Sequence, residues 1–179
     1  MSRKYFYVCS LILITFIIVC ILLTNPNNNL ISINNNVISN TPKELPIAKI
    51  IIPKIKIDNS IYSINSNENT VEKNVMILKE SILPNNDESI IFLAAHSGNG
   101  DIAYFNDLNK LDINDTLIFQ YKNYNYYYII NDKYEIDKDG DIELNKTSPN
   151  QLVLTTCSTT NKAKQLLINS NLVKKEEIT

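Results

Sequence analysis

An almost wholly apolar stretch, residues 7–23, most constrains what this chain can fold into. It approaches the roughly 20 residues that a helix needs to span a bilayer. Arg3 and Lys4 precede it, which predicts a cytoplasmic N-terminus. A cleaved signal peptide is the alternative, but the stretch is longer than the usual signal-peptide core and no small-x-small cleavage site follows it. We therefore expect an uncleaved transmembrane anchor over residues 1–24, a single-pass location in the cell membrane, and a remainder that lies outside the cell.

Two further segments follow the expected anchor. Residues 25–45 are rich in Asn and Ser and poor in apolar residues, which predicts a flexible stalk. Residues 46–179 have the size of one ordinary domain. The net charge is −2 with acidic and basic residues interspersed, so no basic patch indicates nucleic-acid binding. The chain thus reads as an anchor, a stalk and one functional domain.

Short apolar runs separated by turn residues dominate this domain and predict strands. The expected strands cover residues 48–52, 55–62, 89–95, 116–121, 126–134, 152–156 and 165–173. Residues 70–78 are assigned to a short helix, and the spacing of Phe105, Leu108 and Leu111 predicts a helical turn on the core. Many short strands with few helices favour a mostly β fold, a nearly closed or closed β-barrel with one or two short helices.

One thiol and one imidazole stand at the ends of two expected strands. Cys157 follows residues 151–156, and His96, the only histidine, follows residues 90–95. The other two cysteines, Cys9 and Cys20, lie in the expected membrane helix, so Cys157 has no intramolecular disulfide partner outside the cell. A buried inert cysteine and a structural histidine are the alternatives. A cysteine needs an activator to be a good nucleophile near neutral pH, and His96 can provide one.

The segments around these two residues resemble the sortase family. The family motif is Thr-Leu-x-Thr-Cys, and the chain carries Val153-Leu154-Thr155-Thr156-Cys157, which departs at its first position. The segment Ala94-Ala95-His96-Ser97-Gly98-Asn99-Gly100 also looks like the family pattern around its histidine. With the anchor and the stalk, the order and spacing of these motifs extend the resemblance over roughly residues 46–173.

The resemblance implies a sortase-like closed β-barrel and a cysteine transpeptidase activity. Cys157 would attack an LPxTG-like sorting signal, and His96 would stabilise the thiolate and protonate the leaving amine. Thr155, Thr156 and Ala95 are expected to contact the substrate. The implied partners are surface proteins that bear sorting signals and an amine acceptor, either a cell-wall precursor or a pilin lysine. No cofactor or metal is expected, although some relatives require calcium.

One family residue is missing. Sortases carry an arginine at the start of the last strand, and Lys164-Gln165-Leu166-Leu167-Ile168 places Gln165 at that position. The chain has a single arginine, Arg3, on the other side of the expected membrane. Gln165 can donate hydrogen bonds but carries no charge, while Lys162 or Lys164 would bring a charge without the bidentate fork. A plain strand residue with its side chain in solvent is the other interpretation of Gln165.

Two alternatives to a transpeptidase stay open at this point. The first is a thiol peptidase that mainly hydrolyses its acyl-enzyme. The second is a catalytically impaired member that binds sorting signals or pilins without cleaving them, an interpretation that the missing arginine supports. In each case residues 61–81 and 137–150 are expected to form the walls of the peptide groove.

Overall fold

The computed structural model describes residues 44–84, 88–98, 100–140, 142 and 148–178. These residues belong to one compact unit, Glu44–Thr179. Eight strands form a single sheet in this unit: β1 (Ala48–Ile52), β2 (Ile57–Ile61), β3 (Met76–Ile77), β4 (Ser89–Ala94), β5 (Thr116–Tyr121), β6 (Tyr124–Asp137), β7 (Asn150–Cys157) and β8 (Lys164–Glu177). The predicted mostly β fold is confirmed.

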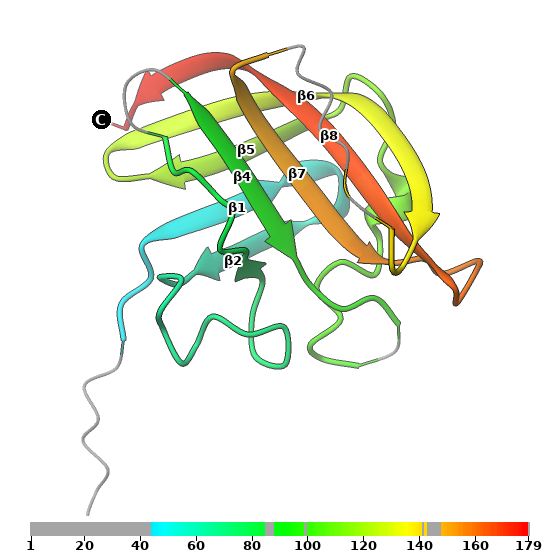
Figure 1. The fold of residues 1–179 in the computed structure, drawn as a ribbon. Helices are drawn as coiled ribbons and strands as arrows, with labels where there is room; N and C mark the ends of the chain where they lie inside the picture. Colours follow the sequence, from blue (N-terminus) through cyan, green and yellow to red (C-terminus); the bar gives the residue numbers. More distant parts are fainter. Residues whose placement is uncertain (1–43, 85–87, 99, 141, 143–147, 179) are drawn as a thin grey trace, which may run out of the picture. The chain divides into compact units, whose positions relative to one another are not determined.

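The sheet curls on itself into a nearly closed barrel (Figure 1). Its strand order is β2-β1-β5-β6-β8-β7-β4-β3, and β2 and β3 are the two ends, so the described strands do not complete the ring. Most neighbours are antiparallel, whereas β4 and β7 run parallel. Parallel strands end at the same edge of a sheet, so the segments that follow β4 and β7 leave the barrel side by side.

Burial on both faces explains why the central residues of β4 and β7 are apolar without a break. The inward side chains join the main core, which includes Ile91, Leu93, Leu152 and Leu154. The outward side chains Phe92 and Val153 form a second, smaller cluster with Leu167 of β8. Apolar residues at every position, instead of at alternate positions, are the pattern expected of strands that are covered on both faces.

Only two short helices occur in the described residues, both of the 3-10 type: η1 (Pro53–Ile55) and η2 (Leu108–Lys110). The second confirms the helical turn on the core, because Phe105, Leu108 and Leu111 are all fully buried. The helix predicted for residues 70–78 is wrong. That segment makes one turn, closed by the Asn74 N–H on the Thr70 carbonyl at 2.9 Å, and then enters β3.

The side chain of Asn69 is the physical reason why this segment is extended. Its amide nitrogen donates to the Ile77 carbonyl at 3.0 Å, and its Oδ1 accepts from the Ile77 N–H at 2.8 Å. A side-chain amide that satisfies both backbone groups of one residue replaces a neighbouring strand, and it competes with the hydrogen bonds of a helix. The sequence pattern alone does not reveal this long-range pairing.

The two longest strands extend beyond their predicted limits. β5 and β6 form a hairpin whose last pair is Tyr121 with Tyr124, so the loop has two residues instead of the four expected. Lys122 in this loop has a φ of 54°, the left-handed conformation that two-residue hairpin loops require. β8 pairs with both β6 and β7. This double pairing holds the start of β8, including Gln165, beside the end of β7.

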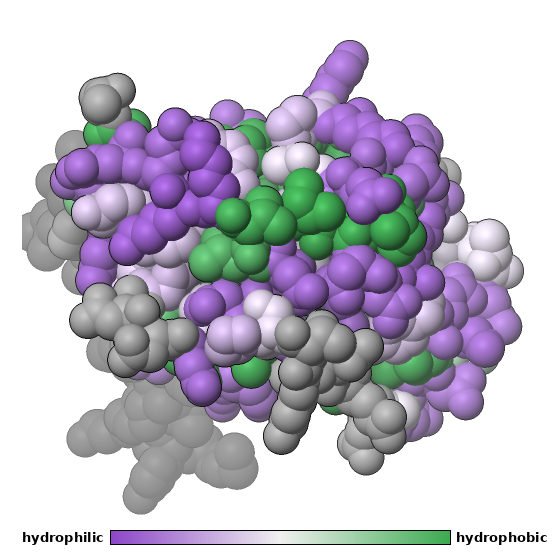
Figure 2. All heavy atoms as spheres, turned by 90° about the horizontal axis from the view of Figure 1, so that it is seen from above, coloured by the Kyte–Doolittle hydropathy of each residue, from purple (hydrophilic) through white to green (hydrophobic). Residues whose placement is uncertain are grey.

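The surface of the unit is mainly polar. Seen from above, apolar side chains gather in one band across the face and polar side chains surround it (Figure 2). The predicted anchor and stalk, residues 1–24 and 25–45, fall almost wholly outside the described residues. Within the part that is described, no helix has the length and hydropathy that a bilayer crossing needs.

Candidate active site

Three strands bring His96, Cys157 and Gln165 to one level of the sheet. In the parallel register Ala94 lies beside Thr155, and His96 and Cys157 each follow that pair by two residues. In the antiparallel register Cys157 lies beside Gln165. Side chains of directly paired residues point to the same face, and alternate residues share a face. Cys157 and Gln165 therefore lie on the outer face, in line with Thr155 and the outer apolar cluster.

A groove of about 330 Å³ on this face contains all three residues. We call it the His96 groove, and its lining consists of Val71, Ala94, Ala95, His96, Lys138, Thr155, Thr156, Cys157 and Gln165. The Cys157 thiol is free and exposed, whereas His96 is half-buried. An accessible thiol and an imidazole in one groove can act on the same bound molecule, which a buried inert cysteine cannot do.

Hydrogen bonds of the backbone fix the position of His96 relative to the thiol. The Ser97 hydroxyl donates to the Cys157 carbonyl at 2.6 Å. The Phe105 N–H donates to the His96 carbonyl at 3.0 Å. The segment that leaves β4 is thus fastened to the end of β7 on one side and to the buried Phe105 on the other.

Thr155, Thr156 and Ala95, the residues expected to contact substrate, all line the His96 groove. The hydroxyls of the two threonines have different partners. Thr156 is buried and its hydroxyl donates to the Ala95 carbonyl at 2.8 Å, which ties β7 to β4. Thr155 donates to Oε1 of Gln165 at 3.4 Å. Thr156 therefore holds the site together, while Thr155 helps to orient Gln165.

Gln165 is half-buried and lines the groove, so it is not a strand residue that points only into solvent. Because Thr155 donates to the Gln165 oxygen, the amide NH₂ is the group left to act as a donor. Two nearby backbone donors are engaged elsewhere, since the Ser158 N–H bonds the Lys164 carbonyl and the Ala95 N–H bonds the Thr155 carbonyl. Side-chain donors, such as the Gln165 amide, are therefore the groups left to donate a hydrogen bond at this point of the groove.

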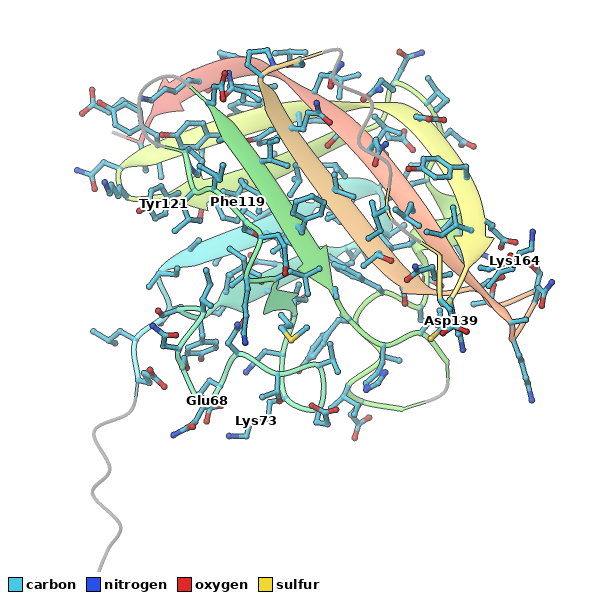
Figure 3. The ribbon with its side chains drawn as sticks, viewed as in Figure 1. Glu68, Lys73, Phe119, Tyr121, Asp139 and Lys164 are labelled. Atoms are coloured by element: carbon cyan, nitrogen blue, oxygen red, sulfur yellow. The ribbon has the colours of Figure 1, made fainter. Side chains whose placement is uncertain are left out.

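The walls of the groove come from the two segments expected to form them. Val71 lies in the 61–81 segment and Lys138 in the 137–150 segment. An ion pair of 2.8 Å between Glu68 and Lys73 closes the turn that carries Val71, and Figure 3 labels both residues. Lys138 was not among the candidate site residues from the sequence. Its position follows from the pairing of β6 with β8, which the sequence pattern does not reveal.

A second pocket of about 210 Å³ meets the groove at the thiol. We call it the Glu135 pocket, and it shares Thr156 and Cys157 with the groove. Oε1 of Glu135 accepts a hydrogen bond from the Ser158 hydroxyl at 2.6 Å. Cys157 thus lies between two concave surfaces, an arrangement that allows two different molecules to approach one sulfur.

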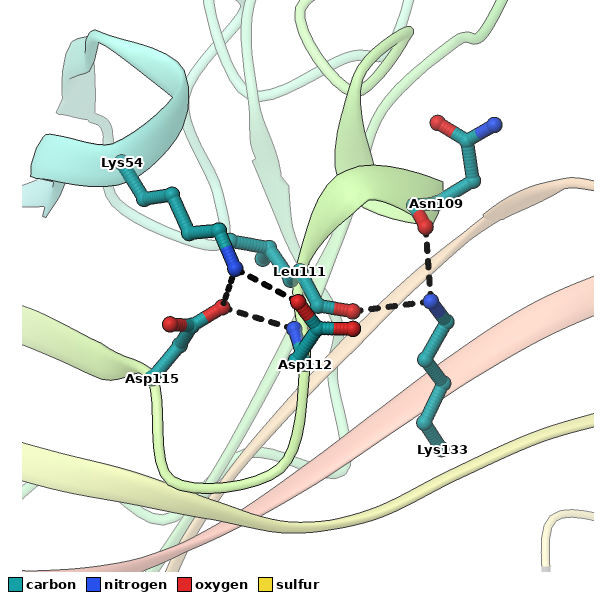
Figure 4. Close-up of polar contacts among 6 residues, drawn as sticks. All are labelled: Lys54, Asn109, Leu111, Asp112, Asp115 and Lys133. Atoms are coloured by element: carbon teal, nitrogen blue, oxygen red, sulfur yellow. Dashed lines mark hydrogen bonds and ion pairs between the residues drawn. The ribbon is translucent and has the colours of Figure 1, made fainter.

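The segment that forms the far wall of the Glu135 pocket is held by charges (Figure 4). Lys133 donates to the carbonyls of Asn109 and Leu111 at 2.7 and 2.8 Å. Lys54 bonds the carboxylates of Asp112 and Asp115, each at 2.7 Å. These bonds raise the pKa of Lys54 above its ordinary value. Burial alone would raise the pKa of Asp115, but hydrogen bonds from Lys54 and the Asp112 N–H hold it below its ordinary value.

Within the described ranges, no three His, Cys, Asp or Glu side chains are grouped in the way that a metal site requires.

Comparison with known proteins now identifies the family. The family model described as the sortase domain matches residues 50–173, which is more than half of the chain. The chain belongs to the sortase family. Comparison with curated protein sequences finds no significant match.

Solved sortase structures share the fold. Sortase A from Corynebacterium diphtheriae is 24% identical with a TM-score of 0.63, over 74% of this chain and 62% of that one. Sortase C-1 from Actinomyces oris is 24% identical with a TM-score of 0.63, over 73% of this chain and 76% of that one. Sortase C-3 from Streptococcus pneumoniae is 18% identical with a TM-score of 0.65, over 75% and 65%. The chain thus spans less than two thirds of the first and third of these proteins, and these identities establish the fold alone.

Proposed function

We propose that this sortase is a cysteine transpeptidase that cleaves an LPxTG-like sorting signal and transfers the protein to an amine. The observation that carries the proposal is the His96 groove, where an exposed thiol, an imidazole and an amide donor meet at one level of three strands. Family membership adds the expectation of thiol-dependent peptide transfer. Neither a structural histidine nor an inert cysteine accounts for this grouping.

The proposed reaction begins with the Cys157 thiolate. Its sulfur attacks the threonine carbonyl carbon of the sorting signal and forms a tetrahedral oxyanion, towards which the Gln165 amide donates. The intermediate collapses, and the His96 imidazolium protonates the glycine amine as the peptide C–N bond breaks. The products of this half-reaction are a thioester on Cys157 and a free glycine-terminated fragment.

An amine then resolves the thioester. The amine nitrogen attacks the thioester carbonyl, neutral His96 takes the proton from the amine, and Cys157 leaves as thiolate. A new amide bond joins the surface protein to a cell-wall precursor or to a pilin lysine. The position of the thiol between the groove and the Glu135 pocket suits a reaction in which one molecule must leave before another attacks.

A catalytically impaired member of the family is the second candidate, and the glutamine at position 165 is the observation that favours it. Removal of one oxyanion donor costs roughly 10²–10³ in rate in well-studied enzymes, so loss of the charged donor lowers the expected activity. Retention of both His96 and Cys157 favours the enzyme.

One assay separates the candidates. The full chain in detergent is incubated with an LPxTG-type peptide, with and without triglycine as the amine, and the products are resolved by mass spectrometry. A peptide–triglycine product that disappears in Cys157→Ala supports transpeptidation. Cleavage without an amine-linked product indicates a hydrolase. Peptide binding without cleavage across a panel of sorting signals indicates the impaired binder.

We also propose a single-pass location in the cell membrane, with the N-terminus in the cytoplasm and the barrel outside. The apolar residues 7–23 and the preceding Arg3 and Lys4 support this topology. In intact cells, a membrane-impermeant maleimide should label Cys157 and leave Cys9 and Cys20 unlabelled. Protection of Cys157 from the reagent, with labelling after lysis, would place the barrel inside the cell.

A further inference from the structure

Lys138 places an ammonium group at the groove that lacks the family arginine. β6 ends at Asp137, which pairs with Lys164, and the preceding pair joins Ile136 to Gln165. Lys138 follows Ile136 by two residues, so its side chain shares the outer face with Gln165. The Lys138 N–H donates to the Ala163 carbonyl at 3.1 Å, which extends the ladder by one residue and fixes the backbone there.

The other nearby lysines are placed differently. Lys162 and Lys164 do not line the His96 groove, although Lys164, labelled in Figure 3, is the first residue of β8 and directly precedes Gln165. Lys164 is the immediate neighbour of Gln165, so its side chain points to the opposite face. Lys133, which lines the Glu135 pocket, is engaged with the backbone carbonyls of Asn109 and Leu111. Among the described residues, Lys138 is thus the lysine that faces the thiol, the imidazole and the amide together.

The ammonium of Lys138 is exposed, and no ion pair within the described part of the chain involves it. A cation on a flexible four-carbon stem can follow a charge that moves by a few ångströms during a reaction. The proposed reaction forms two anions in this groove, the thiolate and the tetrahedral oxyanion. Both are stabilised by a positive charge within the roughly 8 Å over which physiological salt leaves such interactions effective.

We propose that Lys138 supplies the positive charge of this active site, from the turn that follows strand β6, in place of an arginine on strand β8. This inference rests on the proposed function for the identity of the oxyanion. Gln165 contributes the directional amide donor and Lys138 contributes the charge. Two neighbouring side chains thus share what one guanidinium would combine. The division explains how the glutamine is compatible with acyl transfer.

The charge of Lys138 is tested without a peptide. Cys157 in the full chain is alkylated at fixed pH with iodoacetate, an anion, and with iodoacetamide, a neutral reagent, and the Cys157 peptide is quantified by mass spectrometry. Lys138→Met should lower the iodoacetate-to-iodoacetamide rate ratio several-fold, whereas the matched control Lys162→Met should leave it unchanged. Equal ratios in wild type and Lys138→Met would overturn the inference, because the Lys138 ammonium would then have no effect at the sulfur.

A double-mutant cycle tests the catalytic part. Lys138→Met should slow thioester formation about tenfold or more, and adding Gln165→Arg should restore most of the loss, because the guanidinium supplies the missing charge. Lys138→Arg, which keeps the positive charge, should lose much less of this rate than Lys138→Met. A normal rate in Lys138→Met, in a wild-type protein that does form the thioester, overturns the role of Lys138. A wild-type protein that forms no thioester overturns the proposed function, while the alkylation ratio still decides whether Lys138 acts on Cys157.

Discussion

At the scale of single residues, the distinctive position is Gln165. It is level with Cys157, lines the same groove, and accepts a hydrogen bond from Thr155 that leaves its amide hydrogens as donors. A neutral amide aims a hydrogen bond at an oxyanion but adds no charge. The residue therefore fits a weaker oxyanion donor that works together with a separate cation.

Replacement of Gln165 tests that role. Gln165→Ala should lower the rate of thioester formation by roughly 10²-fold, the cost typical of a lost oxyanion donor. Its effect on stability should be small, since the side chain is half-buried and its hydrogen bond with Thr155, at 3.4 Å, is long. Rates are measured with a fluorogenic peptide and stability by urea denaturation.

Gln165→Glu is the matched control for this position. It keeps an oxygen that accepts from Thr155 but removes the amide donor and adds a negative charge, so it should be at least as slow as Gln165→Ala. An unchanged rate in either variant, with an unchanged fold, would show that Gln165 is a strand residue without a part in the reaction.

At the scale of elements, the parallel pair of β4 and β7 builds the site. Both strands end at one edge of the sheet, and the bond from Ser97 to the Cys157 carbonyl fastens the segments that follow them. The wall opposite, around Val71, is not a strand or a helix. It depends on the side chain of Asn69, which takes the place of a strand beside Ile77.

Asn69→Ala should destabilise the protein by about 1–3 kcal/mol, because two buried backbone groups of Ile77 lose their partner. The free energy of unfolding in urea measures the effect. Asn65, an exposed asparagine of the same loop, provides the control, and Asn65→Ala should change stability little. Equal stabilities of the two variants would refute the strand-like role of Asn69.

Many of these strands could be predicted from the sequence, for physical reasons. The apolar runs in β4 and β7 predict strands clearly because both faces of these strands are buried. His96 and Cys157 mark the ends of the two runs. The helix predicted for residues 70–78 failed because a side-chain pairing eight residues apart outweighed local propensity. Lys138 was missed because its place depends on the register of β6 against β8, which no local pattern encodes.

At the scale of the whole molecule, charge networks hold the loops around a barrel whose core is apolar. The network of Lys54, Asp112 and Asp115 joins η1 to the segment that precedes β5, and Lys133 of β6 bonds the same segment from the other side (Figure 4). These contacts position one wall of the Glu135 pocket. Their contribution depends on pH because the network needs ionised carboxylates.

The direction of that dependence follows from the pKa of Asp115, which lies below its ordinary value of 3.8 in the folded protein. A depressed pKa means that the ionised form stabilises the fold, so the contribution is complete above the unfolded value and is lost as the pH falls through the folded value. The midpoint of thermal unfolding should therefore be higher for wild type than for Asp115→Asn near neutral pH. The difference should vanish at strongly acid pH.

Asp101→Asn, at an exposed position without an ion pair in the described residues, is the control for the loss of one carboxylate. It should leave the midpoint close to wild type at each pH. A difference between wild type and Asp115→Asn that stays constant from neutral to strongly acid pH would contradict the role of the ionised carboxylate.

The covalent state of Cys157 during turnover tests the central claim most directly. The full chain is mixed with an LPxTG-type peptide, quenched in acid within seconds, digested, and analysed by intact and peptide mass spectrometry. We expect an acyl group that ends in the threonine of the signal, attached to Cys157, absent in Cys157→Ala and discharged by an added amine. No acyl group on Cys157 across a panel of sorting signals, with the peptide left intact, would contradict the assignment of a cysteine transpeptidase.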